Sequence, residues 1–239
     1  MQTPQVPNAS VYLNELGQEI GFPVPHWQAC PTPQGIQLAG QYCTLEHLTM
    51  QHAADLFTAY VADRENRIWT YLPYGPFADL ASFSAWLSKQ AVSTDPLFYS
   101  VLDKTGKAVG VASYLRLDPA NGVIEVGHIN FSPALQRTQA STEAMYLMMR
   151  HVFDDLGYRR YEWKCNALNA PSCQAAKRLG FSFEGIFRQA AIVKGRNRDT
   201  AWFSILDSEW PALKQRFEAW LAASNFDAQG QQLKALEQS

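Results

Sequence analysis

Residues 127–181 read GHINFSPALQRTQASTEAMYLMMRHVFDDLGYRRYEWKCNALNAPSCQAAKRLGF, and this stretch decides the fold. In order it predicts an extended strand, a loop without acidic residues, a long helix, a second strand and a second helix ending at Leu179-Gly180-Phe181. The first strand, residues 123–131, has a β-rich composition and stops before Pro133. From about residue 138, apolar residues recur three or four positions apart, which gives the long helix one apolar face. They are Met145, Met148, Val152 and Leu156.

The loop between the first strand and the long helix, residues 135–141, presents backbone N–H groups at a helix N-terminus. The helix dipole favours an anion there, and Arg137 adds a positive charge. A capped helix beside a solvated arginine fits this loop equally well. Further evidence has to come from residues farther along the chain.

Residues 136–144, QRTQASTEA, resemble the coenzyme-binding loop of the GNAT superfamily of acetyl-coenzyme A-dependent N-acetyltransferases. In that family a strand is followed by Q/R-x-x-G-x-G/A, whose backbone N–H groups hold the coenzyme pyrophosphate. The branch of Rim-type ribosomal-protein N-terminal acetyltransferases often continues A-T-E-A. Gln136 and Thr142-Glu143-Ala144 match this pattern, whereas Gln139 and Ser141 stand where glycine and glycine or alanine are usual.

A second landmark resembles the family's N-x-x-S/A helix that ends in L-G-F. Asn169, Ser172 and Leu179-Gly180-Phe181 have the expected spacing, and the resemblance extends from about Gln41 to Trp210. It implies an α+β fold in three α/β/α layers, with a central mixed, mostly antiparallel sheet flanked by helices. It also implies acetyl-CoA as the acyl-donor cosubstrate.

The resemblance places the coenzyme along the first strand, the loop and the second helix. Asn169 would contact the pantetheine arm, and Ser172 would lie near the sulfur. The residues implied to bind the coenzyme are Ile129, Asn130, Phe131, Gln136, Arg137, Thr138, Gln139, Ala140, Ser141, Thr142, Asn169, Ser172 and Lys177.

Glu125 is the first candidate for the base that removes the acceptor's proton, and His128 is the second. Strand alternation predicts that Glu125 shares a face with Gly127 and Ile129, and that His128 lies on the other face with Val126 and Asn130. Rim-type enzymes carry a glutamate where this chain has Ala191, and many family members carry a tyrosine acid where it has Ala176. The resemblance to the Rim-type branch implies that Ser172 stabilises the departing thiolate, and helix capping is its alternative role.

Residues 66–77 form an unusually aromatic connector between two predicted helices, residues 49–63 and 77–92. In GNAT-like folds this region borders the acceptor groove, so Trp69, Tyr71 and Tyr74 are candidate substrate-binding residues. Covering a core is the alternative use of such rings. Hairpins are predicted over residues 97–117 and 183–206, and a closing helix over 208–223.

Composition limits the classes of function. A chain of 239 residues with 47% apolar content supports one core, and a formal charge of −2 with a pI near 6.2 gives no field for nucleic acid or an anionic membrane. The four cysteines and five histidines show no metal-ligand spacing, and we expect no metal and a reducing cytoplasm. We expect a Pro-rich arm at residues 1–35, the GNAT-like domain at 36–223 and a fraying polar tail at 224–239.

Two functions from different classes remain open from the sequence. One is an N-acetyltransferase that moves an acetyl group from acetyl-CoA to a primary amine of a small molecule or a peptide N-terminus. The other is a non-catalytic GNAT-fold protein that binds acyl-CoA or a partner protein, which the departures at Gln139 and Ala191 favour. A monomer and a homodimer are both compatible with the arm.

Overall fold

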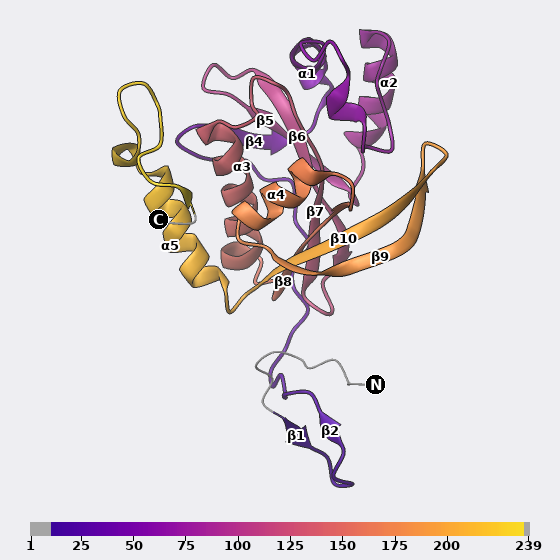
Figure 1. Cartoon of the computed structure of the whole chain (residues 1–239), viewed down its shortest axis with the longest axis vertical. Coiled ribbons are helices and arrows are strands. Elements are labelled where there is room, and N and C mark those ends of the chain that lie inside the picture. Colours follow the sequence, from indigo (N-terminus) through magenta and orange to yellow (C-terminus); the bar gives the residue numbers. More distant parts are fainter. Residues whose placement is uncertain (1–10, 237–239) are drawn as a thin grey trace.

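An eight-stranded sheet forms the centre of the protein in the computed structural model, which describes residues 11–236 (Figure 1). The strand order is β3-β4-β5-β6-β7-β8-β10-β9. Only β7 and β8 pair in parallel, so the prediction of a mixed, mostly antiparallel sheet is confirmed. The strands are β3 (Leu38–Ala39), β4 (Thr44–His47), β5 (Leu97–Leu102), β6 (Ala108–Asp118), β7 (Val123–Phe131), β8 (Arg160–Asn166), β9 (Ser182–Val193) and β10 (Arg196–Leu206).

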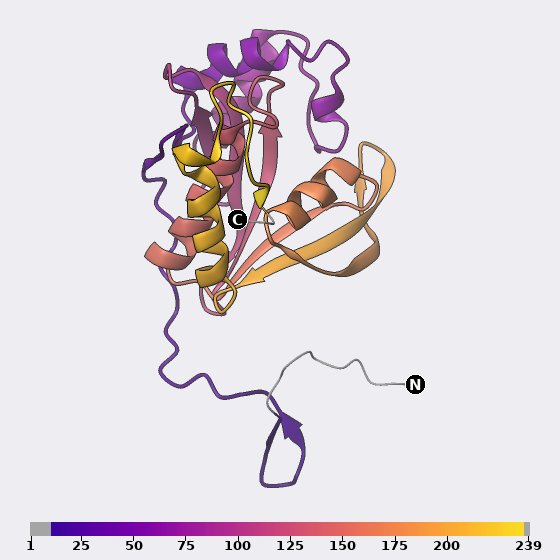
Figure 2. The same ribbon diagram turned by 60° about the vertical axis from the view of Figure 1, so that its left-hand side comes forward.

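Helices cover both faces of this sheet and complete the three predicted layers (Figures 1 and 2). The α-helices are α1 (Ala53–Tyr60), α2 (Leu80–Gln90), α3 (Gln139–Arg150), α4 (Ala170–Arg178) and α5 (Trp210–Leu221). Short 3-10 turns lie at η1 (Met50–His52), η2 (Arg67–Trp69) and η4 (Ala223–Asn225), and a π-helical turn, η3 (His151–Asp155), extends α3.

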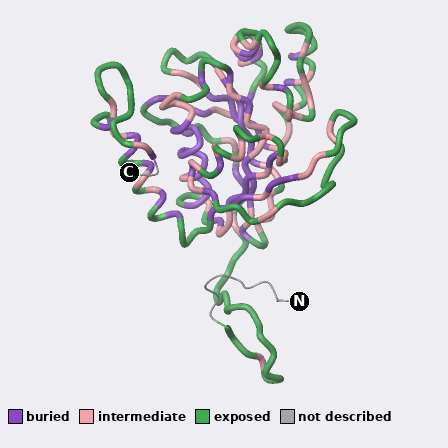
Figure 3. Tube along the Cα trace, in the orientation of Figure 1, coloured by how far each residue is buried: buried purple, intermediate pink, exposed green. Residues whose placement is uncertain are grey.

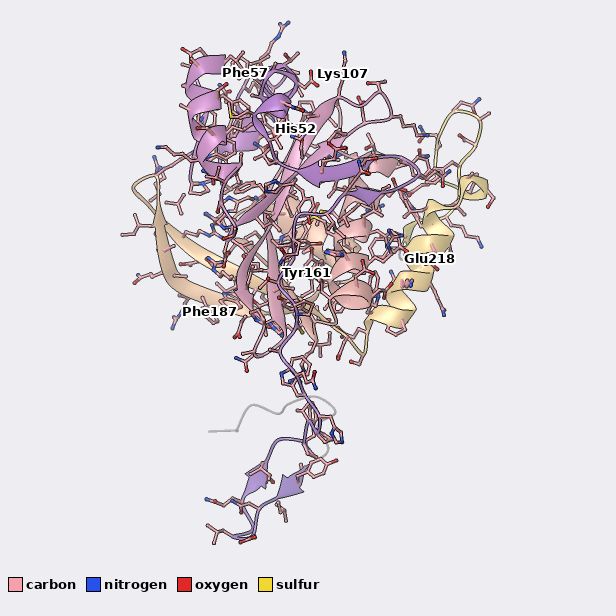
Figure 4. All side chains as sticks on the ribbon, turned by 180° about the vertical axis from the view of Figure 1, so that it is seen from behind. His52, Phe57, Lys107, Tyr161, Phe187 and Glu218 are labelled. Carbon is pink, nitrogen blue, oxygen red and sulfur yellow. The ribbon has the colours of Figure 1, made fainter. Side chains whose placement is uncertain are left out.

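Each face of the sheet has its own apolar core. One core packs α3, α4 and α5 against the sheet and contains Tyr114, Ile124, Val126 and Tyr161, and the other packs α1 and α2 against Phe98 and Val111. Buried residues concentrate in the sheet and on the helix faces toward it (Figure 3). From behind, Tyr161 lies near the middle of the sheet, Glu218 on α5 and Phe187 on edge strand β9, while His52 and Phe57 mark the α1 layer (Figure 4).

The parallel strands β7 and β8 separate partway along their length. Their pairing runs from Val123↔Arg160 to Val126↔Trp163 and then stops, although β7 continues to Phe131 and β8 to Asn166. Residues 127–131 therefore have no partner on the β8 side. Backbone groups must be satisfied somewhere, so this edge suits a ligand that lies between the strands.

Glu143 of α3 fixes the helix against the turn between β3 and β4. Its buried carboxylate accepts backbone N–H groups from Gln41, Tyr42 and Cys43 at 2.6, 2.5 and 2.8 Å. A Cβ at Gly40 would lie 2.5 Å from the same carboxylate. The glutamate of the T-E-A motif is thus a structural anchor for the N-terminal end of α3.

The ends of the described chain differ from each other. Residues 11–35 extend away from the sheet and carry a small hairpin, β1 (Tyr12–Leu13) with β2 (Glu19–Ile20) (Figures 1 and 2). The first part of the predicted arm, residues 1–10, lies outside the described residues. Trp27 attaches the arm through an Nε1–H bond of 2.7 Å to the Ala120 carbonyl. At the other end, the predicted polar tail touches the domain at two points: Phe226 packs on Trp220, and Leu236 is 2% exposed.

Candidate functional site

The N-terminus of α3 keeps several backbone donors free for an anion. Thr138 caps the helix, its hydroxyl accepting from Ser141 N–H, while the Ser141 hydroxyl accepts from Thr138 N–H. Within the described chain, the N–H groups of Arg137, Gln139 and Ala140 make no hydrogen bond. Three orphan donors at the positive end of a helix dipole fit a phosphate group.

Gln139 does not occupy a strained backbone position. It is the first residue of α3, and the residue with positive φ in this loop is Arg137, at φ 59°. The missing family glycine therefore leaves the backbone donors in place. We expect Gln139→Gly to leave the Kd for coenzyme A within about threefold, since no left-handed conformation is relieved. Calorimetry with coenzyme A checks this, and a tenfold tighter variant would contradict it.

Gln136 and Lys177 are two further residues that the resemblance implies in coenzyme binding. The Gln136 side-chain amide donates to the Phe131 carbonyl at 2.8 Å and so ties the loop to the end of β7. Lys177 is exposed on the last turn of α4. The neighbouring Arg178 instead reaches α3, where its guanidinium donates to the Thr142 hydroxyl at 3.2 Å and lies over the Trp220 ring. Sequence reasoning missed Arg178, although it directly follows the predicted lysine.

Ser172 lies beside the point where β7 and β8 separate. Its hydroxyl oxygen accepts the Trp163 Nε1–H at 3.0 Å, and Trp163 belongs to the last paired position of the two strands. Burial raises the pKa of the nearby Cys165 thiol to about 12. Because the oxygen is already an acceptor, its own proton remains available to a sulfur atom. Asn169 caps α4, its side-chain oxygen accepting the Ser172 N–H at 3.2 Å.

His128 lies at a β-bulge in β7, and this changes the predicted arrangement of faces. Its φ is 49°, and the β6–β7 register shifts beside it. The imidazole stacks on Tyr74 and packs against Phe98 of the α1–α2 core, whereas Val126 belongs to the opposite core. The prediction that His128 shares a face with Val126 is therefore wrong. The bulge interrupts strict alternation and brings His128 to the side of Glu125.

Burial, together with the smaller effects of the charges of Arg116 and Arg198, lowers the pKa of His128 from 6.5 to about 4. The imidazole is therefore neutral at pH 7. Its Nδ1 lies 3.3 Å from the Tyr74 hydroxyl.

This pKa predicts acid sensitivity of the fold. A histidine whose pKa is lower in the folded state binds fewer protons when the protein is folded. Its contribution to the free energy of unfolding is therefore present above pH 6.5 and is lost as the pH falls toward 4. Between pH 7 and 4.5, we expect the free energy of unfolding of the wild type to fall by about 2–3 kcal/mol more than that of His128→Gln. Urea titrations at both pH values measure the difference, and parallel losses would contradict it.

Glu125 is held by two cations. Its carboxylate accepts both bonds from Arg116 Nη1, at 2.7 and 2.6 Å, and lies 2.9 Å from Lys164 Nζ. The side chain is 3% exposed. Lys164 also pairs with Glu162 at 2.6 Å, and its ammonium lies over the Trp202 ring. The Glu125 carboxylate is thus shared between two cations.

In the aromatic connector, Trp69 belongs to the core, whereas Tyr71 and Tyr74 lie beside the candidate site. Trp69 is 4% exposed and packs against Tyr60 and Phe77, so the alternative of a core residue holds and it has little surface for a substrate. Tyr74 stacks on His128, and the Tyr71 hydroxyl donates to the Leu168 carbonyl just before α4. The Trp69 carbonyl accepts from Lys194 Nζ at 2.8 Å, which joins the connector to the tip of the β9–β10 hairpin.

Comparisons with known proteins agree with this geometry. Residues 43–182 match the family model described as "Acetyltransferase (GNAT) domain". A solved GCN5-related N-acetyltransferase from Brucella melitensis is 52% identical, covers 90% of this chain and 98% of its own, and has a TM-score of 0.88. The "Uncharacterized N-acetyltransferase p20" of Bacillus licheniformis is 27% identical over 70% of this chain and 94% of its own length.

A further relative points to the Rim-type branch. The "Ribosomal-protein-serine acetyltransferase" of Escherichia coli (strain K12) is 29% identical over 44% of this chain and 59% of its own length.

The helix N-terminus beside two separating parallel strands, together with the matched family model, identifies the protein as an acyltransferase. The chain belongs to the GNAT acetyltransferase family, and its homologues include Rim-type enzymes. Across residues 11–236, no group of three His, Cys, Asp or Glu side chains is arranged to hold a metal ion. No helix in the same range is long and apolar enough to span a membrane.

Proposed function

We propose that this protein transfers an acetyl group from acetyl-CoA directly to a primary amine. The observation that carries the proposal is the separation of β7 and β8, with an anion-binding helix end and Ser172 on one face and His128 on the other. In this arrangement an acyl donor and an amine would approach from opposite sides of the sheet. The acceptor is a small-molecule amine or a peptide N-terminus, and the name of the Escherichia coli relative supports the latter class.

The residues of the α3–α4 face fit the donor. The free N–H groups of Arg137, Gln139 and Ala140 would hold its pyrophosphate, with the Arg137 side chain adding charge. The unpaired edge of residues 127–131, including Ile129, Asn130 and Phe131, would bind the rest of the donor through backbone groups. Acetyl-CoA supplies an activated thioester carbonyl. Ser172 donates a hydrogen bond to the sulfur as negative charge develops on it.

The residues of the other face handle the amine. A nucleophilic amine must be neutral, and the positive charges of Arg116, Lys164 and Arg198 disfavour its protonated form. We assign proton acceptance during attack to His128, because its ring nitrogens form no ion pair among the described residues, while the Glu125 carboxylate is already paired with Arg116 and Lys164. Glu125 then positions Arg116 and Lys164. This reverses the order of preference that the sequence suggests.

The alternative of a non-catalytic GNAT-fold protein was favoured by the departures at Gln139 and Ala191, and the first of these no longer supports it. Gln139 adopts a helical conformation, so the absent loop glycine removes no backbone donor. Ala191 remains without a carboxylate, and His128 takes over the role that a glutamate there would have.

Two measurements test the proposal together. Calorimetry with coenzyme A reports donor binding, and thiol release from acetyl-CoA over a panel of primary amines reports transfer, with an amine-free reaction as the measure of hydrolysis. We expect micromolar binding and amine-dependent thiol release. Binding without release on any amine would favour the non-catalytic protein, and absence of binding would refute both.

A further inference from the structure

Three glutamates form ion pairs on the face of the sheet that carries His128 and lies beside the aromatic connector. Glu125 pairs with Arg116 and Lys164, Glu162 with Lys164 and Arg160, and Glu184 with Arg160. Arg160 and Lys164 are mostly buried, with side chains 24% and 7% exposed. These pairs form one connected network that crosses β6, β7, β8 and β9.

Arg198 of β10 is a cation that takes no part in this network of ion pairs. It is half-buried, and among residues 11–236 it forms no ion pair. Its only side-chain hydrogen bond in that range runs from Nε to the Thr200 hydroxyl at 3.2 Å. Burial lowers the pKa of Arg198, and the nearby charge of Arg116 acts in the same direction. A half-buried guanidinium without a carboxylate is costly unless a ligand supplies one.

A neighbour of Arg198 also offers a donor. Thr200 lies two residues from Arg198 on β10, so both side chains lie on the same face. The Thr200 hydroxyl accepts from Arg198 and keeps its own proton to donate. A guanidinium and a hydroxyl in contact with each other match the oxygens of a carboxylate or phosphate.

This donor group lies near the atom that would receive the acceptor's proton. The charge of Arg198 acts on His128, while the Lys194–Trp69 contact joins the tip of the β9–β10 hairpin to the connector that carries Tyr74. An anion held by Arg198 and an amine held at His128 would therefore belong to one small molecule or one chain end.

We propose that the acceptor is an amine that also carries an anionic group, a carboxylate or a phosphate, which Arg198 binds with help from Thr200. The inference rests on the proposed acetyl transfer and names its substrate class. Arg198 is thus a specificity-determining residue of the acceptor site.

Matched amine pairs test this. β-Alanine against β-alaninamide isolates a carboxylate, and phosphoethanolamine against ethanolamine isolates a phosphate. We expect the anionic member of at least one pair to have a kcat/KM about tenfold or more above its neutral partner, as one charge-assisted hydrogen bond provides. Which pair shows the preference distinguishes the two anions.

Substitutions then connect the preference to the site. Arg198→Gln should bring the anionic-to-neutral ratio of kcat/KM close to one, whereas Arg196→Gln should leave the ratio unchanged, because Arg196 is an exposed arginine of the same strand. A ratio that survives in Arg198→Gln, or an equal use of both members by the wild type, would overturn the inference.

A binding measurement covers the case in which no amine of the panel is acetylated. β-Alanine and phosphoethanolamine should raise the Tm of the wild type in the presence of coenzyme A, and the shift should disappear in Arg198→Gln but not in Arg196→Gln. Equal shifts in the wild type and Arg198→Gln, or none in either, would refute the anion site. Coenzyme A binding and thiol release with the neutral amines report separately on the proposed transferase activity.

Discussion

Replacing His128 with glutamine is expected to lower kcat by about 10²–10⁴-fold with the acceptor saturating. The amide can accept a hydrogen bond but cannot take a proton, so the amine must lose its proton to water. Steady-state thiol release measures the effect, and calorimetry should show coenzyme A binding within a few-fold of the wild type, because the imidazole packs against Tyr74 and Phe98 on the other face of the sheet.

The pH dependence separates His128 from Glu125. With a His128 pKa of about 4, wild-type turnover should follow the free-amine fraction of the acceptor and show no inflection near pH 6.5. If Glu125→Gln loses more activity than His128→Gln, and recovers it at high pH where the amine is neutral, then Glu125 is the base. That result would show that the Arg116 and Lys164 pairs open when the acceptor binds.

The substitution Glu143→Ala is expected to reduce the free energy of unfolding by about 3–5 kcal/mol. It removes a buried acceptor of three backbone N–H groups, and those of Tyr42 and Cys43 are left buried without a partner. For a chain of this size the loss corresponds to a fall in Tm of about 10 °C. Thermal and urea unfolding both measure it.

Glu218→Ala is the matched control for this prediction. Glu218 is an exposed glutamate of α5 that accepts one bond, from the Tyr146 hydroxyl at 3.0 Å. Its removal should cost about 1 kcal/mol or less. Comparable losses in the two variants would mean that the turn at Gln41 to Cys43 finds other partners, and that Glu143 is not the anchor of α3.

The elements were largely predictable, since each follows from a local pattern. The strand expected at 123–131 is β7 with the same bounds, and the long helix, the hairpins and the closing helix lie within a few residues of their expected ranges. Period and turn residues carry this information within a short window of sequence. Membership of the family was likewise visible in Gln136, Thr142-Glu143-Ala144 and Asn169-Ser172.

The site depended on contacts between distant segments. Alternation along β7 suggested opposite faces for Glu125 and His128, but the bulge at His128 places both on one side. Nothing local marks a bulge here, because it arises from the register with β6. In the same way, only the pairing of β8 with β7 and β10 brings Lys164 to Glu125 and closes the network.

The sequence by itself therefore determined the order of elements and the family, because these follow from short-range periodicity and motif spacing. The tertiary structure alone decided that Glu125 is paired with Arg116 and Lys164, that His128 is neutral and faces the same side, and that Trp69 is buried. It also decided that Arg198 has no carboxylate partner among residues 11–236. Protonation and pairing depend on burial and on charges from strands far apart in the chain, which no local pattern records.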